Sequence, residues 1–268
     1  MITGNSGNNV IAGLGGADTL DGGAGKDTAT YATSPVGVNV SLVMGLGSGG
    51  DAQGDKLSNI ENLTGSNFND TLEGDAGANV LNGGAGINTV SYEHATAGVT
   101  VHLATTAAQN TGGAGSDILL NFQNLIGSAF NDTLTGTTGA NTITGGAGND
   151  TVKGGGGADF LAGGLGNDVF VFTKLADSLP ANPTTITDFV HGSDVINLLA
   201  IDANTSASGN QAFLFGGQNA NVTAHGVTWT ESGGNTIIHA DVNGNTTADL
   251  TIVLTGLHHN LTASDFIL

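Results

Sequence analysis

The chain has 268 residues, including 46 Gly but only three Pro and no Cys. Its 23 Asp and Glu residues are opposed by only four Lys, which gives a formal net charge of −19. This charge excludes nucleic acid and anionic membranes as natural partners. No apolar run approaches the roughly 20 residues of a membrane span, so we expect no membrane insertion. The alternative to a folded protein is an acidic, Gly-rich disordered chain that repels itself until counter-ions bind.

In chain order, the first feature is a block of nine-residue repeats over residues 4–30: GNSGNNVIA, GLGGADTLD and GGAGKDTAT. Each unit starts with Gly and carries an apolar residue at position 8. Position 6 is held by Asn9, Asp18 and Asp27. After Tyr31 the glycine pattern stops, and apolar residues from Val36 to Leu42 alternate with small or polar ones. This alternation predicts a half-buried strand.

A second block, residues 65–91, repeats the unit three times with Asp70, Asn79 and Asn88 at position 6. The interruption that follows copies the first one, because Tyr92 opens it just as Tyr31 opens the first. Asp132 follows Asp70 at nearly the same spacing. A higher-order repeat of a strand-rich insert followed by a block predicts a solenoid whose units bury faces on one another.

The third block, residues 127–172, holds five units in strict register: GSAFNDTLT, GTTGANTIT, GGAGNDTVK, GGGGADFLA and GGLGNDVFV. Their sixth positions are Asp132, Asn141, Asp150, Asp159 and Asp168. Glycines at positions 1, 2 and 4 permit a turn with positive φ and leave its carbonyls uncovered. The last three positions predict a short strand whose middle side chain points to one face. All eleven units keep position 8 apolar, as a filled interior requires.

The pattern G-G-x-G-x-D-x-U-x resembles the RTX (hemolysin-type) calcium-binding repeats. The resemblance implies an all-β fold, a parallel β-roll (a right-handed β-solenoid of nonapeptide repeats). It also implies that two nonapeptides make one coil, so that each turn lies beside the turn eighteen residues on. Several Ca²⁺ ions would then bind between such turns, through Asp oxygens and glycine carbonyls. Calcium suits these ligands because it is a hard cation that takes about 6–8 oxygens.

The spacing predicts which turns lie together. The metal-ligand candidates are Asn9, Asp18, Asp27, Asp70, Asn79, Asn88, Asp132, Asn141, Asp150, Asp159 and Asp168. Steps of eighteen pair Asn9/Asp27, Asp70/Asn88, Asp132/Asp150, Asn141/Asp159 and Asp150/Asp168. Asp18 has no such partner in its block. Glu61 and Gln123 fall at position 6 of degenerate units before the second and third blocks, and we expect these units to continue the coil; chance strands are the alternative.

Beyond Phe172 the nonapeptide period stops. Short β-rich runs with turn signals predict an antiparallel β C-terminal cap over the end of the roll. Residues 188–268 resemble the C-terminal module of serralysin-type secreted metalloproteases. The resemblance is carried by ITDFVHGSDVINLLAID (186–202), GNQAF (209–213), DVNGNTTADLTIVLTG (241–256) and LTASDFIL (261–268). We therefore expect two domains, a β-roll over residues 1–172 and a cap over residues 173–268.

The serralysin resemblance implies export through a type I (ABC) exporter that reads an uncleaved signal at the extreme C-terminus. Asp265 before the apolar run Phe266-Ile267-Leu268 fits such a signal. The first residues show neither the charged nor the apolar segment of a secretory signal peptide. We therefore expect either a fragment or an export signal elsewhere, and a secreted, extracellular protein.

No enzyme signature is found. The seven His are scattered without an H-E-x-x-H motif, and neither a G-x-S-x-G motif nor a thiol is present. We expect a non-catalytic calcium-binding module. The alternative is a calcium-dependent glycan-binding or adhesive module that binds polysaccharide, similar to the roll modules of alginate epimerases. Two local alternatives stay open: residues 241–249 could bind calcium or form a tight hairpin loop, and Trp229 could pack in the core or form a sugar platform.

Overall fold

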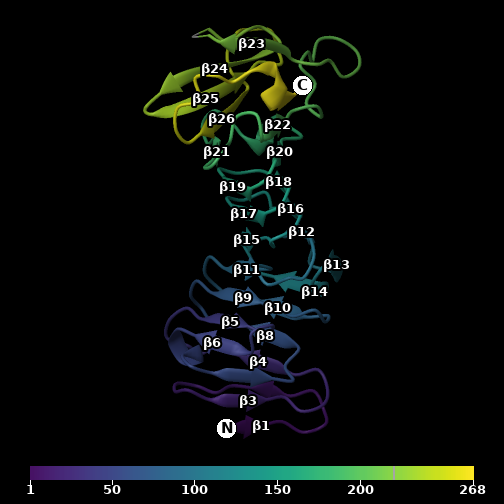
Figure 1. The fold of residues 1–268 in the computed structure, drawn as a ribbon, viewed down its shortest axis with the longest axis vertical. Coiled ribbons are helices and arrows are strands. Elements are labelled where there is room, and N and C mark those ends of the chain that lie inside the picture. Colours follow the sequence, from purple (N-terminus) through teal and green to yellow (C-terminus); the bar gives the residue numbers. More distant parts are fainter. Residues whose placement is uncertain (220) are drawn as a thin grey trace. The chain divides into compact units, whose positions relative to one another are not determined.

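The computed structural model describes residues 1–219 and 221–268 and consists of short strands joined by turns (Figure 1). The all-β prediction is confirmed. In the described part of the chain, the helical elements are three single 3₁₀ turns: η1 (Gly50–Ala52), η2 (Leu175–Asp177) and η3 (Ala263–Asp265). Among the described residues, no helix has the length and apolarity to cross a membrane. The chain forms two compact units, residues 1–129 and residues 130–268.

In the first unit, one sheet runs in the order β1 (Ile2–Thr3), β3 (Thr19–Asp21), β7 (Lys56–Ser58), β6 (Leu46–Ser48), β5 (Asn39–Ser41), β9 (Thr71–Glu73), β11 (Thr89–Ser91) and β15 (Asn124–Ile126). A second sheet runs in the order β13 (Gln109–Gly112), β14 (Gly115–Leu120), β10 (Val80–Asn82), β8 (Asn62–Thr64), β4 (Thr28–Thr30) and β2 (Val10–Ile11). Strand β12 is Thr100–His102.

In the second unit, one sheet runs in the order β17 (Thr142–Ala147), β19 (Phe160–Leu165), β21 (Thr184–Ile186), β26 (Leu250–Leu254), β25 (Asn235–Ala240), β24 (Gly226–Ser232) and β23 (Leu214–Gln218). The other sheet has β16 (Thr133–Thr135), β18 (Thr151–Lys153), β20 (Val169–Val171), β22 (Val195–Asn197) and β27 (Phe266–Ile267).

Strand pairing follows the predicted eighteen-residue coil. Within the blocks the pairs are parallel, with Val10 opposite Thr28, Thr71 opposite Thr89 and Thr133 opposite Thr151. Consecutive nonapeptides therefore alternate between two sheets, and the middle residue of each strand faces the space between them. All eleven residues at position 8 are buried, from Ile11 at 5 % exposure to Phe170 at 0 %. This single column of apolar side chains forms the core of the roll.

The two inserts continue the coil but add hairpins. Strand β8 pairs in parallel with β4, and β15 pairs in parallel with β11, so the degenerate units before the second and third blocks belong to the roll as predicted. In the first insert β6 pairs antiparallel with both β5 and β7. In the second insert β13 pairs antiparallel with β14. The hairpins lie in different sheets, although the inserts are copies in sequence.

The C-terminal region combines antiparallel and parallel pairing. The cap forms an antiparallel meander of β24, β25 and β26, as predicted. It joins the roll through parallel pairs, because β21 lies beside β19 and β22 lies beside β20. Strands β26 and β27 then extend the two sheets by pairing with β21 and β22. Trp229 is 2 % exposed within this cap, so it packs in the core and cannot serve as a surface platform for a sugar.

Candidate metal centres: the turn columns

Between strands, the sixth residues of stacked turns form hydrogen-bonded columns. The backbone N–H of each sixth residue donates to the side-chain oxygen of the sixth residue one coil further on. The N–H groups of Asp132, Asp150 and Asp168 donate in this way to Asp150, Asp168 and Asp194, at 2.8, 2.9 and 3.0 Å. The column thus brings four carboxylates into one file in the second unit.

The structure brings together all five pairs predicted from the eighteen-residue step. Besides the two pairs in that file, Asn9 N–H donates to Asp27, Asp70 N–H to Asn88 and Asn141 N–H to Asp159. The role of these residues as metal ligands stays a prediction, whereas their stacking is a feature of the fold.

The inserts supply hydrogen-bonding partners for two sixth residues, Asp18 and Asn79, that the eighteen-residue step left without one. Asp18 N–H donates to Asp55 at 2.8 Å, and Asn79 N–H donates to Asp117 at 3.1 Å. Glu61 and Gln123 occupy the predicted position 6, since they accept the N–H groups of Asp27 and Asn88 at 2.7 Å each.

A short signal could have identified Asp55, Asp117 and Asp194. Each is followed two residues later by a buried apolar residue, namely Leu57, Leu119 and Ile196. The second half of the nonapeptide is therefore kept at all three places. At Asp117 the first half is kept as well, because residues 112–120 read GGAGSDILL, with Gly at positions 1, 2 and 4.

Ten of the eleven turns fall into two kinds, which differ at position 2. In six open turns the second residue has a positive φ, from 61° at Leu14 to 120° at Gly146. These turns are residues 13–18, 22–27, 83–88, 145–150, 154–159 and 163–168. Only Leu14 adopts this conformation without being glycine in these six positions. Because glycine reaches positive φ without steric cost, the open turns favour it at this position.

In four self-capped turns, residues 4–9, 65–70, 74–79 and 136–141, the N–H of position 2 donates to the side chain of position 6. The acceptors are Asn9, Asp70, Asn79 and Asn141, at 2.6–2.8 Å. The side chain of position 2 in turn accepts the N–H of position 4, as Ser66 does from Phe68. These turns satisfy their sixth residue with protein donors.

The open turns leave carboxylate oxygens without donors. Asp27 Oδ2, Asp150 Oδ2 and Asp168 Oδ2 are buried and have no hydrogen-bond partner among the described residues. A glycine at position 1 lies directly against each carboxylate: a Cβ added at Gly145 would stand 2.2 Å from Asp150 Oδ2 and 2.4 Å from the carbonyl oxygen of Gly163. Carboxylate and glycine carbonyl oxygens therefore converge at this turn, and this donor set fits a hard divalent cation.

Electrostatics point to the same need for a cation. Burial raises the pKa of Asp150 from 3.8 to about 7, and the neighbouring charges of Asp132 and Asp168 add to the rise. Burial also raises the pKa of Asp159 to about 6 and raises the pKa of Asp168. A buried carboxylate without a compensating charge is unfavourable, so these turns favour either a proton or a metal ion.

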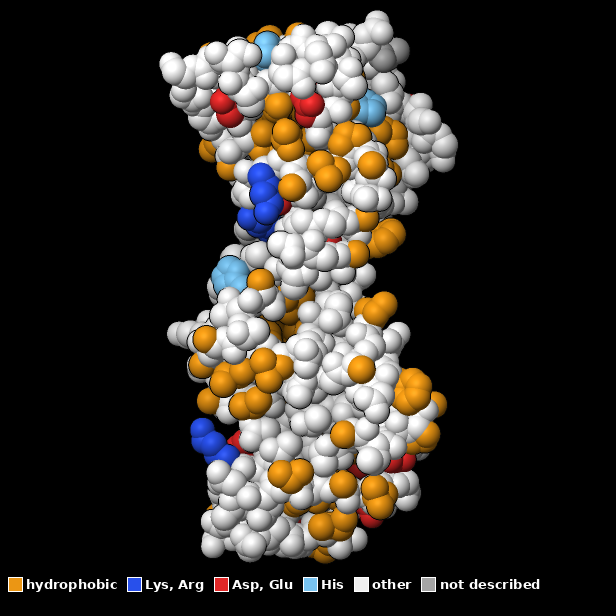
Figure 2. Space-filling model, turned by 180° about the vertical axis from the view of Figure 1, so that it is seen from behind, with side chains coloured by type: hydrophobic (Ala, Val, Ile, Leu, Met, Phe, Trp, Pro, Cys, Tyr) orange, Lys and Arg blue, Asp and Glu red, His pale blue; other side chains and the backbone are white. Residues whose placement is uncertain are grey.

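The distribution of charge over the whole chain is consistent with this geometry. Thirteen of the 23 Asp and Glu side chains are buried, and most of these belong to the turn columns. Figure 2 accordingly shows only small areas of acidic side chains on the face that it presents. Much of the negative charge of the protein therefore lies inside the turns.

In the inserts, two column aspartates each accept a hydrogen bond from a tyrosine hydroxyl group. Tyr31 Oη donates to Asp55 Oδ2 at 3.1 Å, and Tyr92 Oη donates to Asp117 Oδ2 at 3.2 Å. This contact is common to the two copies and explains why both inserts open with a tyrosine. Burial raises the pKa of Asp117 to about 6 even with this hydrogen bond.

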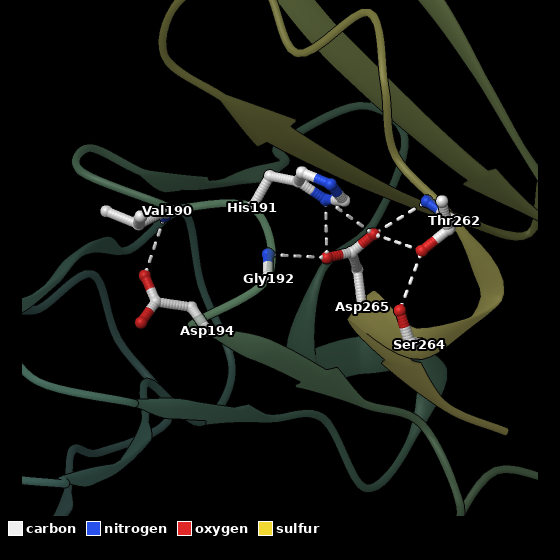
Figure 3. Close-up of polar contacts among 7 residues, drawn as sticks. All are labelled: Val190, His191, Gly192, Asp194, Thr262, Ser264 and Asp265. Atoms are coloured by element: carbon white, nitrogen blue, oxygen red, sulfur yellow. Dashed lines mark hydrogen bonds and ion pairs between the residues drawn. The ribbon is translucent and has the colours of Figure 1, made fainter.

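The C-terminal segment contacts the turn that carries Asp194, through His191 and Gly192 (Figure 3). Asp265 accepts hydrogen bonds from the backbone N–H groups of Thr262 and Gly192, at 2.6 and 3.1 Å. His191 Nδ1 lies 2.8 Å from Asp265 Oδ1, and these contacts lower the pKa of Asp265 against the effect of its burial. The terminal residues therefore have defined partners in the folded chain.

The loop 241–249 is satisfied by its own backbone. Asp241 accepts the N–H groups of Asn243, Gly244 and Thr246, at 2.9, 2.8 and 2.6 Å. Asn243 Nδ2 donates to Asp249. These contacts favour the hairpin-loop interpretation over a calcium site.

One protein family and two solved structures relate this chain to known proteins. The family described as peptidase M10 serralysin C terminal matches residues 2–268. Two similar solved structures are the AlgE6R3 subunit of the Azotobacter vinelandii mannuronan C5-epimerase and the extracellular lipase LipA from Serratia marcescens. The first is 28% identical with a TM-score of 0.33, and the match covers 52% of this chain and 78% of that one.

The lipase is 14% identical with a TM-score of 0.28, and the match covers 77% of this chain and 39% of the lipase. The comparison with curated proteins found no match. The family match spans the roll and the cap together, so this chain belongs to the peptidase M10 serralysin C-terminal family.

Proposed function

We propose that this chain is a non-catalytic, calcium-binding RTX module of a secreted protein, which folds when calcium binds outside the cell. The observation that supports the proposal most directly is the set of buried, unpartnered oxygens of Asp27, Asp150 and Asp168. A bound calcium ion supplies positive charge and accepts about 6–8 oxygen ligands.

The two kinds of turn assign different roles to the predicted ligands. In the proposal, Asp18, Asp27, Asp150, Asp159 and Asp168, the acidic sixth residues of open turns, hold ions. Asp132 is proposed as a ligand through its place in the column, because its N–H donates to Asp150, and not through the kind of its own turn. The side chains of Asn9, Asp70, Asn79 and Asn141 hold the self-capped turns. Asn88 belongs with the second group although its turn is open, because its Nδ2 donates to the carbonyl oxygens of Ala85 and Asn121. The Asn88 amide therefore already donates to the carbonyl oxygens that an ion would coordinate.

Calcium should act as the folding switch. The strands of the blocks have only two to six residues, and ordering their glycine-rich turns is entropically costly. Each ion that binds only the folded state stabilises it by RT ln(1 + [L]/Kd), about 2.7 kcal/mol at a hundredfold excess over Kd. Several sites together can match the usual net stability of about 5–15 kcal/mol.

A calcium titration after chelation tests the proposal, with far-UV circular dichroism as the readout. We expect little β signal without calcium, a cooperative gain at millimolar calcium and poor substitution by magnesium, which demands a tighter octahedral geometry. A chelated protein that keeps its full β signal and its unfolding temperature would contradict the switch.

We also propose that the C-terminal segment directs export through a type I exporter. The family match supports this role, and Asp265 to Leu268 carry the acidic and apolar residues of such a signal. Deletion of the last four residues should abolish secretion by a compatible exporter. Undiminished secretion of the truncated chain would exclude this role.

A further inference from the structure

Outside the turn columns, one cluster of metal-ligating side chains lies on the first unit. It consists of Glu73, the last residue of β9, and of Glu93 and His94, which follow β11. One potential ligand atom from each of the three residues lies within 4.8 Å of the others. Strands β9 and β11 are neighbours in the sheet, so the fold itself brings these residues together.

Glu73 is the buried member of the cluster. Its side chain stands at position 9 of a nonapeptide and is only 5 % exposed as a residue. It accepts hydrogen bonds from Ser41 Oγ and from the backbone N–H of His94, the latter at 3.1 Å. His94 Nδ1 lies 3.0 Å from both of its carboxylate oxygens. The carboxylate is therefore held in one orientation by donors from two other segments.

A groove of roughly 320 Å³ opens beside the cluster and is lined by all three residues. Asn39, Ser41 and Thr71 contribute polar groups to the same groove. His94 and Glu93 are exposed, so their side chains can be reached from solvent while Glu73 is fixed beneath them. A cation at the cluster would thus have an entry path and a free coordination position toward the groove.

The chemistry of the three ligands selects the kind of ion. One imidazole nitrogen and two carboxylates suit zinc, which binds His nitrogen and Glu oxygen at about 2.0–2.2 Å in tetrahedral sites. Two ligands at that distance on a tetrahedral ion lie about 3.3 Å apart. His94 Nδ1 and Glu73 already lie 3.0 Å apart as a hydrogen-bonded pair, so an ion would replace the proton between them with little movement. Calcium is disfavoured because it requires about 6–8 oxygen ligands.

The cluster is not a by-product of the repeat. Tyr92 is followed by Glu93 and His94, whereas Tyr31, at the same place in the first insert, is followed by Ala32 and Thr33. Glu73 ends the first nonapeptide of the second block, whereas Thr135 ends the first nonapeptide of the third. The three ligands therefore come together only once in the duplicated sequence.

We propose that Glu73, Glu93 and His94 form a binding site for a zinc-like divalent transition metal, independent of the calcium turns, with an open coordination position facing the groove. A divalent ion would balance the charge of the two carboxylates at this place.

The test is a calorimetric titration of the full chain with Zn²⁺ in saturating calcium, so that the turn columns are filled throughout. We expect one site that calcium does not displace. His94→Gln and Glu93→Gln should each weaken this site by about tenfold or more, since replacing residues that only support a metal ligand already costs about 10–100-fold in affinity. Both residues are exposed, so the variants should keep the fold, which circular dichroism in calcium checks.

His102→Gln is the matched control, because His102 is exposed on β12 of the same unit and lies outside the groove. It should bind Zn²⁺ as the unmodified protein does. Unchanged Zn²⁺ affinity in His94→Gln, displacement of Zn²⁺ by calcium, or an equal loss in His102→Gln would overturn the site. The calcium-dependent folding assay is unaffected by these outcomes, so the two proposals fail separately.

Discussion

At the scale of single residues, the hydrogen-bond donors around the sixth residue of a turn decide whether its side chain keeps an oxygen free for an ion. Asp70 accepts Ser66 N–H and Val38 N–H on different oxygens, at 2.6 and 2.7 Å. Asp150 accepts one N–H, from Asp132, and keeps Oδ2 without a donor. Both residues are Asp at the same position of the repeat, yet only the second has an oxygen left for an ion.

The first prediction compares these two residues. Asp150→Asn should remove calcium binding at its turn and weaken the adjoining sites, because Asp132 and Asp168 stack on it in the same column. Asp70→Asn should lower the stability of the calcium-loaded protein by about 1–3 kcal/mol, since it loses a buried acceptor, without changing the number of ions bound. Calorimetric stoichiometry and denaturant unfolding give the two readouts. Loss of an ion in Asp70→Asn would contradict the division of the turns.

The second prediction concerns Leu14, which has a φ of 61° and is 57% exposed. A left-handed conformation costs a non-glycine residue about 1–2 kcal/mol, whereas glycine loses about 0.5–1 kcal/mol through its greater freedom in the unfolded chain. Leu14→Gly should therefore stabilise the calcium-loaded protein by roughly 0.5–1 kcal/mol.

Denaturant unfolding in saturating calcium measures the effect of Leu14→Gly. Ala12→Gly is the control, since Ala12 is exposed and has no positive φ, and it should destabilise the protein slightly. Equal destabilisation by the two substitutions would show that Leu14 is not strained.

At the scale of elements, the strands are too short to be stable alone and depend on their neighbours. Strand β27 has two residues, and it pairs with β22 through Phe266 opposite Ile196 and Ile267 opposite Asn197. Phe266 is 6 % exposed, whereas Ile267 is 39 % exposed. The C-terminal strand thus closes the end of its sheet with one buried aromatic side chain.

The third prediction follows from this difference. Phe266→Ala should destabilise the folded protein by about 3–5 kcal/mol, because it removes a buried aromatic ring and leaves a cavity. Ile267→Ala should cost clearly less, since much of its side chain already faces solvent. Denaturant unfolding in saturating calcium separates the two. Similar losses would mean that β27 does not dock as described.

At the scale of the whole molecule, buried charge connects folding to calcium and to pH. In the absence of calcium, the folded-state pKa values of Asp150, Asp159 and Asp117 lie near 7, 6 and 6, above the ordinary value of 3.8. The folded chain therefore binds protons more tightly than the unfolded chain between about pH 4 and pH 7. By linkage, its stability falls as the pH rises through this window.

The fourth prediction is that acid partly replaces calcium. In calcium-depleted buffer, lowering the pH from about 8 to about 5 should increase the β signal, since protons neutralise the turn carboxylates. Far-UV circular dichroism against pH measures this, and Asp150→Asn should reduce the pH dependence. A β signal that stays constant or falls on acidification would show that carboxylate repulsion does not limit folding.

We could predict the repeat register, the apolar column at position 8 and the five pairs of turns eighteen residues apart from the sequence alone. These features are predictable because strand, turn and core positions recur at a fixed local spacing. The predicted boundary between roll and cap at residue 172 stays a prediction. Strands β22 and β27, both beyond it, extend the sheet of β20.

The tertiary structure was needed to show which turns keep a free oxygen and which turns lie beside Asp55, Asp117 and Asp194. Asp55, Asp117 and Asp194 stack at separations of 37, 38 and 26 residues, because inserts of unequal length bring them beside their partners. The donors to a column carboxylate can likewise come from a distant place in the sequence, as the Tyr31 hydroxyl group does for Asp55. Such contacts depend on where the chain returns in space, so a periodic pattern cannot reveal them.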